Sequence, residues 1–311
     1  MAKVKVKDNS GLAKFNRFLT VVLVILLVAT IAIVIFSSPK VAVQENSGEI
    51  QDVSVVDPAF KAGTYGGVDF ASEEDVVNYY IECYNKTKAK TADYIDSVGA
   101  PAQYYAMLGE DNLLIEDLLI DGKENAAISN LVPGIAGGLF SHGLNGLPPS
   151  RSCDPLNDND DDGVSYLTSR LTQEDILATN VADNGDGTIT LTIQPKLSEM
   201  SVPGKDAQGR FFMTLGDITG VVDSISALTW ASGDTASNIL CHYMGGTGTI
   251  KIDTAAGEIV EADYNMVVKI EVNHANIAVI KDKSASLTIK YDMHYPASDE
   301  YMMENKSVKR A

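Results

Sequence analysis

The sequence predicts an α+β protein, with a single N-terminal transmembrane helix followed by an antiparallel β-sheet that helices cover on one face. Three observations carry this prediction. An uncharged apolar run occupies residues 18–36, several later segments alternate apolar and polar residues, and others place apolar residues at helical spacing. We divide the chain into a cytosolic basic tail (1–17), a transmembrane helix (18–36), a linker or stalk (37–71) and an extracytoplasmic α+β domain (72–311).

The apolar run 18–36 spans 19 residues and contains no charged side chain. A helix of that length measures about 28 Å, which is enough to cross the hydrocarbon core of a bilayer. Five basic residues precede the run, and acidic residues dominate the segment that follows it. The positive-inside rule therefore predicts a single-pass protein of the cell membrane, with a cytosolic N-terminus and an extracytoplasmic domain. The alternative is a cleaved signal peptide, whose apolar region is usually shorter.

The charge of the chain excludes one class of partner. The 311 residues carry a formal net charge of −18. Residues 1–17 account for +4 of that, which leaves −22 on the rest of the chain. Nucleic-acid binding needs a concentrated basic surface, so we expect no nucleic-acid partner. The expected partners are the membrane, through residues 18–36, and a lipid or protein at the cell surface.

The extracytoplasmic domain opens with the pattern of an amphipathic helix. Ser72 is a good N-cap, and three acidic residues follow it where the helix dipole favours negative charge. Val76, Tyr80 and Tyr84 share one face and predict core packing. Asn78, Glu82, Lys86 and Lys88 point elsewhere.

Two further segments are expected to supply helical cover for the sheet. Residues 111–140 are rich in leucine and isoleucine and predict helix in part, ending at Pro133. Residues 217–228 carry apolar side chains at helical spacing. The glycine-rich stretch 134–149 is either a buried connection or a mobile lid over an apolar pocket.

The remainder of the domain predicts antiparallel strands. Residues 259–272 alternate apolar and polar side chains over most of their length, with Tyr264 on the apolar face and Asp263 on the wet face. Residues 287–295 repeat the pattern, with Asp292 and His294 on the wet face. Shorter candidates are 189–193, 239–244, 250–253 and 276–280, and the glycines at 245–248 are read as a turn.

The order of these pieces resembles that of a known group of proteins. The segments that carry the likeness are EDVVNYYIECYNKTKAKT, YLTSRLTQEDI, TIKIDTAAGEIVEADYNMVVKIEV and SLTIKYDMHY. Their order is similar to that in a family of uncharacterised membrane-anchored or secreted proteins of anaerobic Gram-positive bacteria, which implies no activity. More loosely, the strands resemble those of bacterial lipoprotein carriers, whose sheet cradles a lipid against helices, although the lipid-anchored cysteine is missing here.

One acidic motif suggests a metal. Asp158, Asp160 and Asp162 with Gly163 form D-x-D-x-D-G, in which alternate carboxylates of a loop converge on a hard cation. Ser169 stands where a calcium loop has its bidentate glutamate, and a solvated acidic loop is the alternative. The prediction is a structural calcium ion and no other cofactor.

The cysteines and histidines form no recognisable cluster. Cys83, Cys153 and Cys241 allow one bridge plus a free thiol, or three idle thiols, and the pairing stays open. A three-ligand metal site from His142, His242 and His294 is conceivable, and surface histidines are the alternative.

No catalytic motif is present, so we predict a non-enzymatic role in envelope structure or surface interaction. The first alternative is a binder or carrier of apolar, lipid-like ligands between sheet and helices. The second is a cell-envelope hydrolase whose site is not visible in one sequence.

Overall fold

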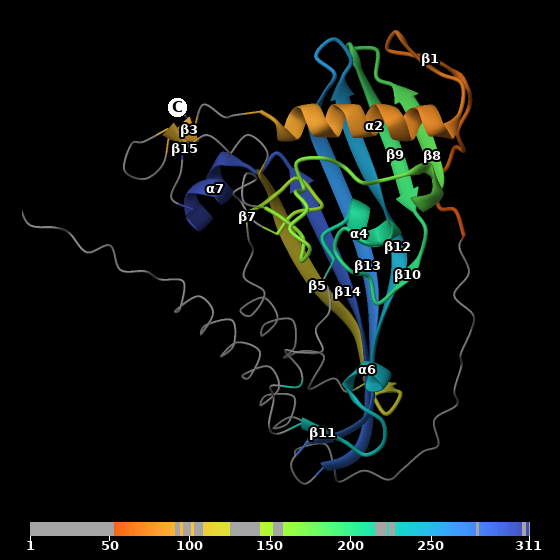
Figure 1. The fold of residues 1–311 in the computed structure, drawn as a ribbon, viewed down its shortest axis with the longest axis vertical. Helices are drawn as coiled ribbons and strands as arrows, with labels where there is room; N and C mark the ends of the chain where they lie inside the picture. The colour runs from red at the N-terminus through yellow and green to blue at the C-terminus, as the bar shows by residue number, and fades with distance from the viewer. Residues whose placement is uncertain are drawn as a thin grey trace, which may run out of the picture.

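The computed structural model describes residues 53–90, 94–95, 101–102, 108–124, 144–151, 158–214, 223, 228–277, 280–306 and 309–310. The fold is dominated by one antiparallel sheet with the strand order β6-β5-β14-β13-β12-β9-β8. Figure 1 shows α2 lying across one end of the sheet. The long strands extend well beyond that helix to the opposite end.

The bounds of the elements are as follows. The small strands of the first half are β1 (Gly63–Tyr65), β2 (Val68–Phe70), β3 (Tyr94–Ile95), β4 (Pro101–Ala102), β6 (Lys123–Glu124) and β7 (Leu144–Gly146). The remaining strands are β5 (Leu108–Ile120), β8 (Ile176–Asp183), β9 (Thr188–Pro195), β10 (Ser198–Glu199), β11 (Leu228–Trp230), β12 (Ile239–Asp253), β13 (Glu258–Ile277), β14 (Ile280–Tyr295) and β15 (Lys309–Arg310). The helices are α2 (Glu73–Lys88), η3 (Gln173–Asp175), α4 (Ala207–Phe211), α6 (Thr235–Asn238) and α7 (Asp299–Lys306).

The helix predicted after Ser72 is confirmed as α2. Ser72 and Asp75 form a capping box, in which each side chain accepts a hydrogen bond from the other's backbone N–H. Tyr80 and Tyr84 are fully buried, as the apolar stripe predicts. Lys88 is an exception to the predicted polar face, because its side chain is also buried.

The predicted strands at 259–272 and 287–295 are confirmed within β13 and β14, which pair antiparallel along nearly their whole length. The glycines at 245–248, read as a turn, lie inside β12 instead. Gly245 and Gly246 have positive φ where the register of β12 shifts against β13. A Cβ at Gly246 would lie 1.9 Å from the Asn265 carbonyl oxygen. Only glycine fits this bulge.

The α+β prediction, in which helices cover a face of the sheet, is wrong, because α2 and α4 cover only part of that face. The part of the chain that the structure describes is mostly β-sheet, with 49% of those residues in strands and 17% in helices. Residues 111–120, expected to be partly helical, lie in strand β5, which pairs with β14. A bulge accounts for the difference: Asp117 has a φ of 51°, and the register shifts between Ser286 and Thr288 of the partner strand. The extra residue changes which side chains face inward, so the segment does not alternate like a regular strand.

The other predicted cover segments lie largely outside the described residues. This applies to 125–140 and to most of 217–228. The transmembrane segment 18–36 also lies outside them. Among the residues that the structure describes, no helix has the length and apolar character needed to span a membrane.

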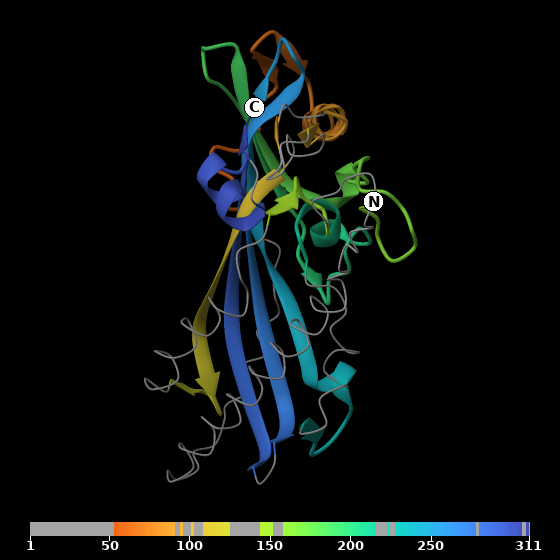
Figure 2. The same ribbon diagram turned by 90° about the vertical axis from the view of Figure 1, so that its left-hand side faces the viewer.

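The core lies between α2, α4 and the sheet, and Figure 2 shows the two helices on the same side of the strands. Its centre is aromatic. The ring centroids of Phe211 and Tyr264 are 5.3 Å apart, and those of Tyr80 and Phe211 are 5.7 Å apart. The hydroxyls of Tyr80 and Tyr264 are 3.0 Å apart and form a hydrogen bond. This bond satisfies two polar atoms that the packing removes from water.

Residues 53–71, which the sequence assigned to the stalk, contact this body. The Val55 N–H donates to Gln194 Oε1, and the Gln194 amide donates to the Val53 carbonyl. Strands β1 and β2 form a hairpin that ends at Phe70, whose ring packs in the core. The chain that directly precedes α2 therefore packs against the folded body.

Candidate functional site

The predicted calcium segment is a hydrogen-bonded part of the body. Asp158 is 1% exposed and accepts hydrogen bonds from the Ser150 hydroxyl at 2.5 Å and from the Arg151 N–H at 2.8 Å. Burial raises the pKa of Asp158, although these two donors oppose the change. Asp158 thus fixes residues 150–151 against the 158–166 loop.

Asp160 and Asp162 are also matched with partners from the chain. Arg170 reaches Asp160 at 2.5 Å, and Lys205 forms an ion pair with Asp162. Burial acts to raise the pKa of Asp160, but the Val164 N–H and the Arg170 guanidinium outweigh it, and the net pKa is lowered. A structural calcium ion on Asp158, Asp160 and Asp162 stays a prediction. To bind, it would have to compete with these donors.

Lys88, at the end of α2, is the most unusual group near this loop. Its side chain is 1% exposed, and among the described residues its Nζ has no hydrogen-bond partner. The Nζ lies 5.6 Å from the centre of the Tyr84 ring. Burial lowers the pKa of Lys88 to about 8, against the opposing charge of Asp158. The cation is stabilised by Asp158 at a distance rather than by a direct ion pair.

Ser150 lies close to Lys88, yet the pair lacks the geometry of a nucleophile and its base. A Cβ added to Gly146 would lie 2.6 Å from Ser150 Oγ and 3.2 Å from Lys88 Nζ, so both groups border the same glycine. In a Ser–Lys pair the amine accepts the hydroxyl proton. Here the Ser150 hydroxyl donates to Asp158 instead. The arrangement is better suited to joining α2 to the loop than to attacking a substrate.

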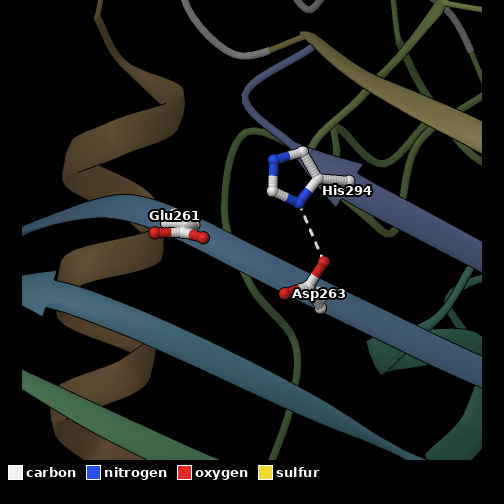
Figure 3. A group of neighbouring side chains, drawn as sticks. All are labelled: Glu261, Asp263 and His294. Atoms are coloured by element: carbon white, nitrogen blue, oxygen red, sulfur yellow. Dashed lines mark hydrogen bonds and ion pairs between the residues drawn. The ribbon is translucent and has the colours of Figure 1, made fainter. Parts of the chain in front are cut away.

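The opposite face of the sheet carries a different kind of cluster. In the described part of the chain, the ligand atoms of Glu261, Asp263 and His294 all lie within 4.8 Å of one another. Figure 3 shows them projecting from β13 and β14, with α2 behind the sheet. His294 Nδ1 is 2.8 Å from Asp263 Oδ1. The side chains of His294 and Asp263 are 41% and 52% exposed. We refer to these three residues as the β13–β14 carboxylate–histidine group.

The charge of Asp263 acts on its neighbours on the same face. Asp292, two residues before His294 on β14, has a raised pKa, mainly through burial. Lys290 opposes this shift and Asp263 adds to it. The raised pKa of Asp292 therefore reflects its burial, and the charge of Lys290 outweighs that of Asp263 at this position.

The other histidines do not join this group. His242 pairs with Lys269 across β12 and β13, whereas His294 pairs with Asp263, six residues away along β13. At about 3.3 Å per residue the two imidazoles are separated by roughly 20 Å. His142 lies outside the described residues. The predicted histidine site therefore does not assemble from His242 and His294, and His294 gains carboxylate neighbours instead.

Cys83 and Cys241 are free thiols in the core. Burial raises the pKa of Cys83 to about 12 and that of Cys241 to about 11. Both are therefore held in the unreactive thiol form. Cys153 lies outside the described residues, so its state stays open.

Comparison with family models, with curated proteins and with solved structures found no match to the chain. The resemblance to membrane-anchored or secreted proteins of anaerobic Gram-positive bacteria therefore stays a prediction. The chemistry must be argued from the side chains themselves.

Sequence reasoning placed Asp263 and His294 on wet faces but did not bring them together. One signal could have done so. Strand β13 ends and β14 begins at the cross-strand pair Ile277–Ile280. Equal numbers of residues counted from that pair along both strands lead to Asp263 and His294, which are also partners. A hairpin closed by the Ile277–Ile280 pair would have predicted the pairing, whereas residues 276–280 were read as one short strand.

Proposed function

We propose that the chain is a membrane-tethered extracytoplasmic protein with a binding rather than a catalytic role, acting in envelope structure or surface interaction. The observation that carries the proposal is the contrast between the two faces of the sheet. One face is packed under α2 and α4, and the other presents charged side chains to solvent. The tether comes from the uncharged run at 18–36 and the basic residues before it.

The packed face leaves the described core closed. Tyr80, Tyr84, Phe211, Phe212 and Tyr264 are each no more than 1% exposed, and their rings fill the space between the helices and the sheet. A lipid carrier would need that space. The alternative of an apolar-ligand carrier is therefore not favoured by the described core. The glycine-rich segment that suggested a lid lies mostly outside the described residues.

The exposed face has the properties of a recognition surface. Its charged side chains come from neighbouring strands that are hydrogen-bonded over long stretches, which fixes their spacing. Because the sheet already holds the backbone of these residues in place, binding does not have to order the backbone. An acidic body also favours basic or cationic partners, because complementary charge raises the rate of encounter.

The tether and its orientation can be tested with cysteine labelling on intact cells. The chain is expressed in a Cys153→Ser background, since Cys83 and Cys241 are buried. A Glu174→Cys variant, at an exposed position of η3, should react with a membrane-impermeant maleimide. A Lys3→Cys variant is the matched control and should react only after the cells are permeabilised.

Labelling of Lys3→Cys but not Glu174→Cys on intact cells would reverse the orientation and refute the proposal. Recovery of a shortened chain from the culture medium would refute the tether. Native mass spectrometry of the full chain in mild detergent addresses the binding role. A stable adduct of lipid mass would replace the proposal with the carrier alternative.

A further inference from the structure

We propose that Glu261, Asp263 and His294 bind a divalent transition-metal ion of the zinc class on the exposed face of the sheet. The site is formed by backbone register. Asp263 and His294 are direct cross-strand partners on β13 and β14. Glu261 lies two residues before Asp263 and so points to the same face. Figure 3 shows all three side chains on that face.

The spacing of the ligand atoms suits an ion. Zinc binds imidazole nitrogen and carboxylate oxygen at about 2.0–2.2 Å, so two neighbouring ligand atoms of a tetrahedral site lie about 3.4 Å apart. His294 Nδ1 and Asp263 Oδ1 are 2.8 Å apart in their hydrogen bond, and small rotations of these exposed side chains bring them to the spacing of ligands. Glu261 completes a set that lies within 4.8 Å. Its side chain is exposed and can rotate toward the ion without disturbing the core.

The charge of the group is not balanced by the surrounding chain. Lys251 stands directly opposite Glu261 on β12, yet its Nζ lies 3.7 Å from Asp186. Among the described residues, Glu261 has no salt bridge to a lysine or arginine. With a neutral imidazole the group carries two negative charges, which one divalent ion neutralises. This contrasts with Asp160 and Asp162, whose cations are already supplied by the chain.

The ligand types select the class of ion. Calcium and magnesium prefer all-oxygen sites, whereas an imidazole with two carboxylates suits zinc and related transition ions. Three protein ligands leave at least one coordination position for water. The site is exposed, so the ion can enter directly from solvent.

The structure also supplies a matched control. His274 Nδ1 lies 2.8 Å from Asp282 Oδ1, the same distance as in the His294–Asp263 pair. Both pairs are exposed and both join β13 to β14. The His274–Asp282 pair is not part of a three-ligand group among the described residues. If metal binding needs the third ligand, only the His294 group should show it.

The test uses the full chain in detergent, in a Cys153→Ser background, stripped of metal with a chelator. Zinc chloride is titrated by calorimetry. We expect one saturable site per chain, with affinity lowered at least about tenfold by His294→Ala, Asp263→Asn or Glu261→Gln. The His274→Ala variant should bind as the parent does. Zinc should also raise the melting temperature of the parent and of His274→Ala but not of His294→Ala.

Several outcomes would overturn the inference. These are the absence of saturable binding, equal binding by His294→Ala and the parent, or equal loss in His274→Ala and His294→Ala. The melting temperatures without zinc show whether each variant is folded. All four substitutions change exposed side chains, so they should leave that temperature nearly unchanged. Failure of the metal site would not affect the labelling test of the tether.

Discussion

The molecule holds two groups of carboxylates whose surroundings differ sharply. On the side of the sheet that α2 packs against, Asp158 and Asp160 are buried and receive donors from Ser150, Arg151 and Arg170. On the opposite face, Glu261 and Asp263 are exposed and share one imidazole. A buried carboxylate must be matched within the chain, because an unmatched charge in the interior is costly. An exposed one need not be, and its unmatched charge is available to a ligand.

This difference assigns separate roles to chemically similar residues. The buried group joins α2 to the 146–170 segment and so acts on stability. The β13–β14 carboxylate–histidine group is available to bind an ion from solvent. Sequence alone favoured the buried group as the metal site, because its D-x-D-x-D-G spacing is local. The exposed group is assembled from residues 31 positions apart.

The largest expected effect comes from substituting the same residue type in the two groups. Asp158→Asn removes the charge that stabilises Lys88 and weakens two hydrogen bonds in the interior. We expect a loss of about 3 kcal/mol in the free energy of unfolding. Asp263→Asn, its exposed counterpart, should change that free energy by less than about 0.5 kcal/mol. Urea unfolding of both variants in the same detergent gives the comparison, and similar losses would remove the distinction between the groups.

A second prediction concerns pH and the buried cation. The pKa of Lys88 is lowered to about 8 in the folded state from an ordinary value of 10.5. Between these values the folded chain binds fewer protons than the unfolded chain at this group, so its contribution to stability rises with pH. The slope approaches about 1.4 kcal/mol per pH unit within the window and is absent below it.

The contribution of Lys88 is measured as the difference between two pH profiles of the free energy of unfolding, because other groups titrate in the same range. Burial raises the pKa of Cys83, which acts in the opposite direction as pH rises. Subtracting the profile of Lys88→Met from that of the parent should leave the rise between pH 8 and pH 10.5. Lys90→Met, which removes an exposed lysine paired with Glu258, is the control for the loss of one positive charge. A flat difference for Lys88→Met would contradict the burial argument.

The comparison also shows what sequence could and could not reveal about the fold. Strands β13 and β14 were predicted because their alternation is uninterrupted over most of their length. Strand β5 was missed because a bulge at Asp117 gives its apolar residues a spacing that also fits a helix. Capping and amphipathic pattern located α2, since both are local features of the chain.

The candidate sites depended on contacts that no local pattern encodes. Lys88 was assigned to the polar side of α2. It is buried because residues 146–150, far along the chain, pack over it. His294 was placed on the wet face correctly, but its partner Asp263 depends on strand register. Register belongs to the two strands together and cannot be derived from the alternation of either strand alone.

The smallest expected effect tests whether the exposed face contributes to stability at all. Lys290 and Glu116 form an ion pair at 2.6 Å between β14 and β5, with side chains 46% and 36% exposed. A double-mutant cycle with Lys290→Ala and Glu116→Ala should give only a small coupling energy, as exposed ion pairs do. That coupling should shrink further at high salt, because exposed charges are screened. A large coupling energy that does not depend on salt would contradict this expectation. It would show that the charges of the exposed face stabilise the fold, as those of the buried group do, and are not available to bind a partner.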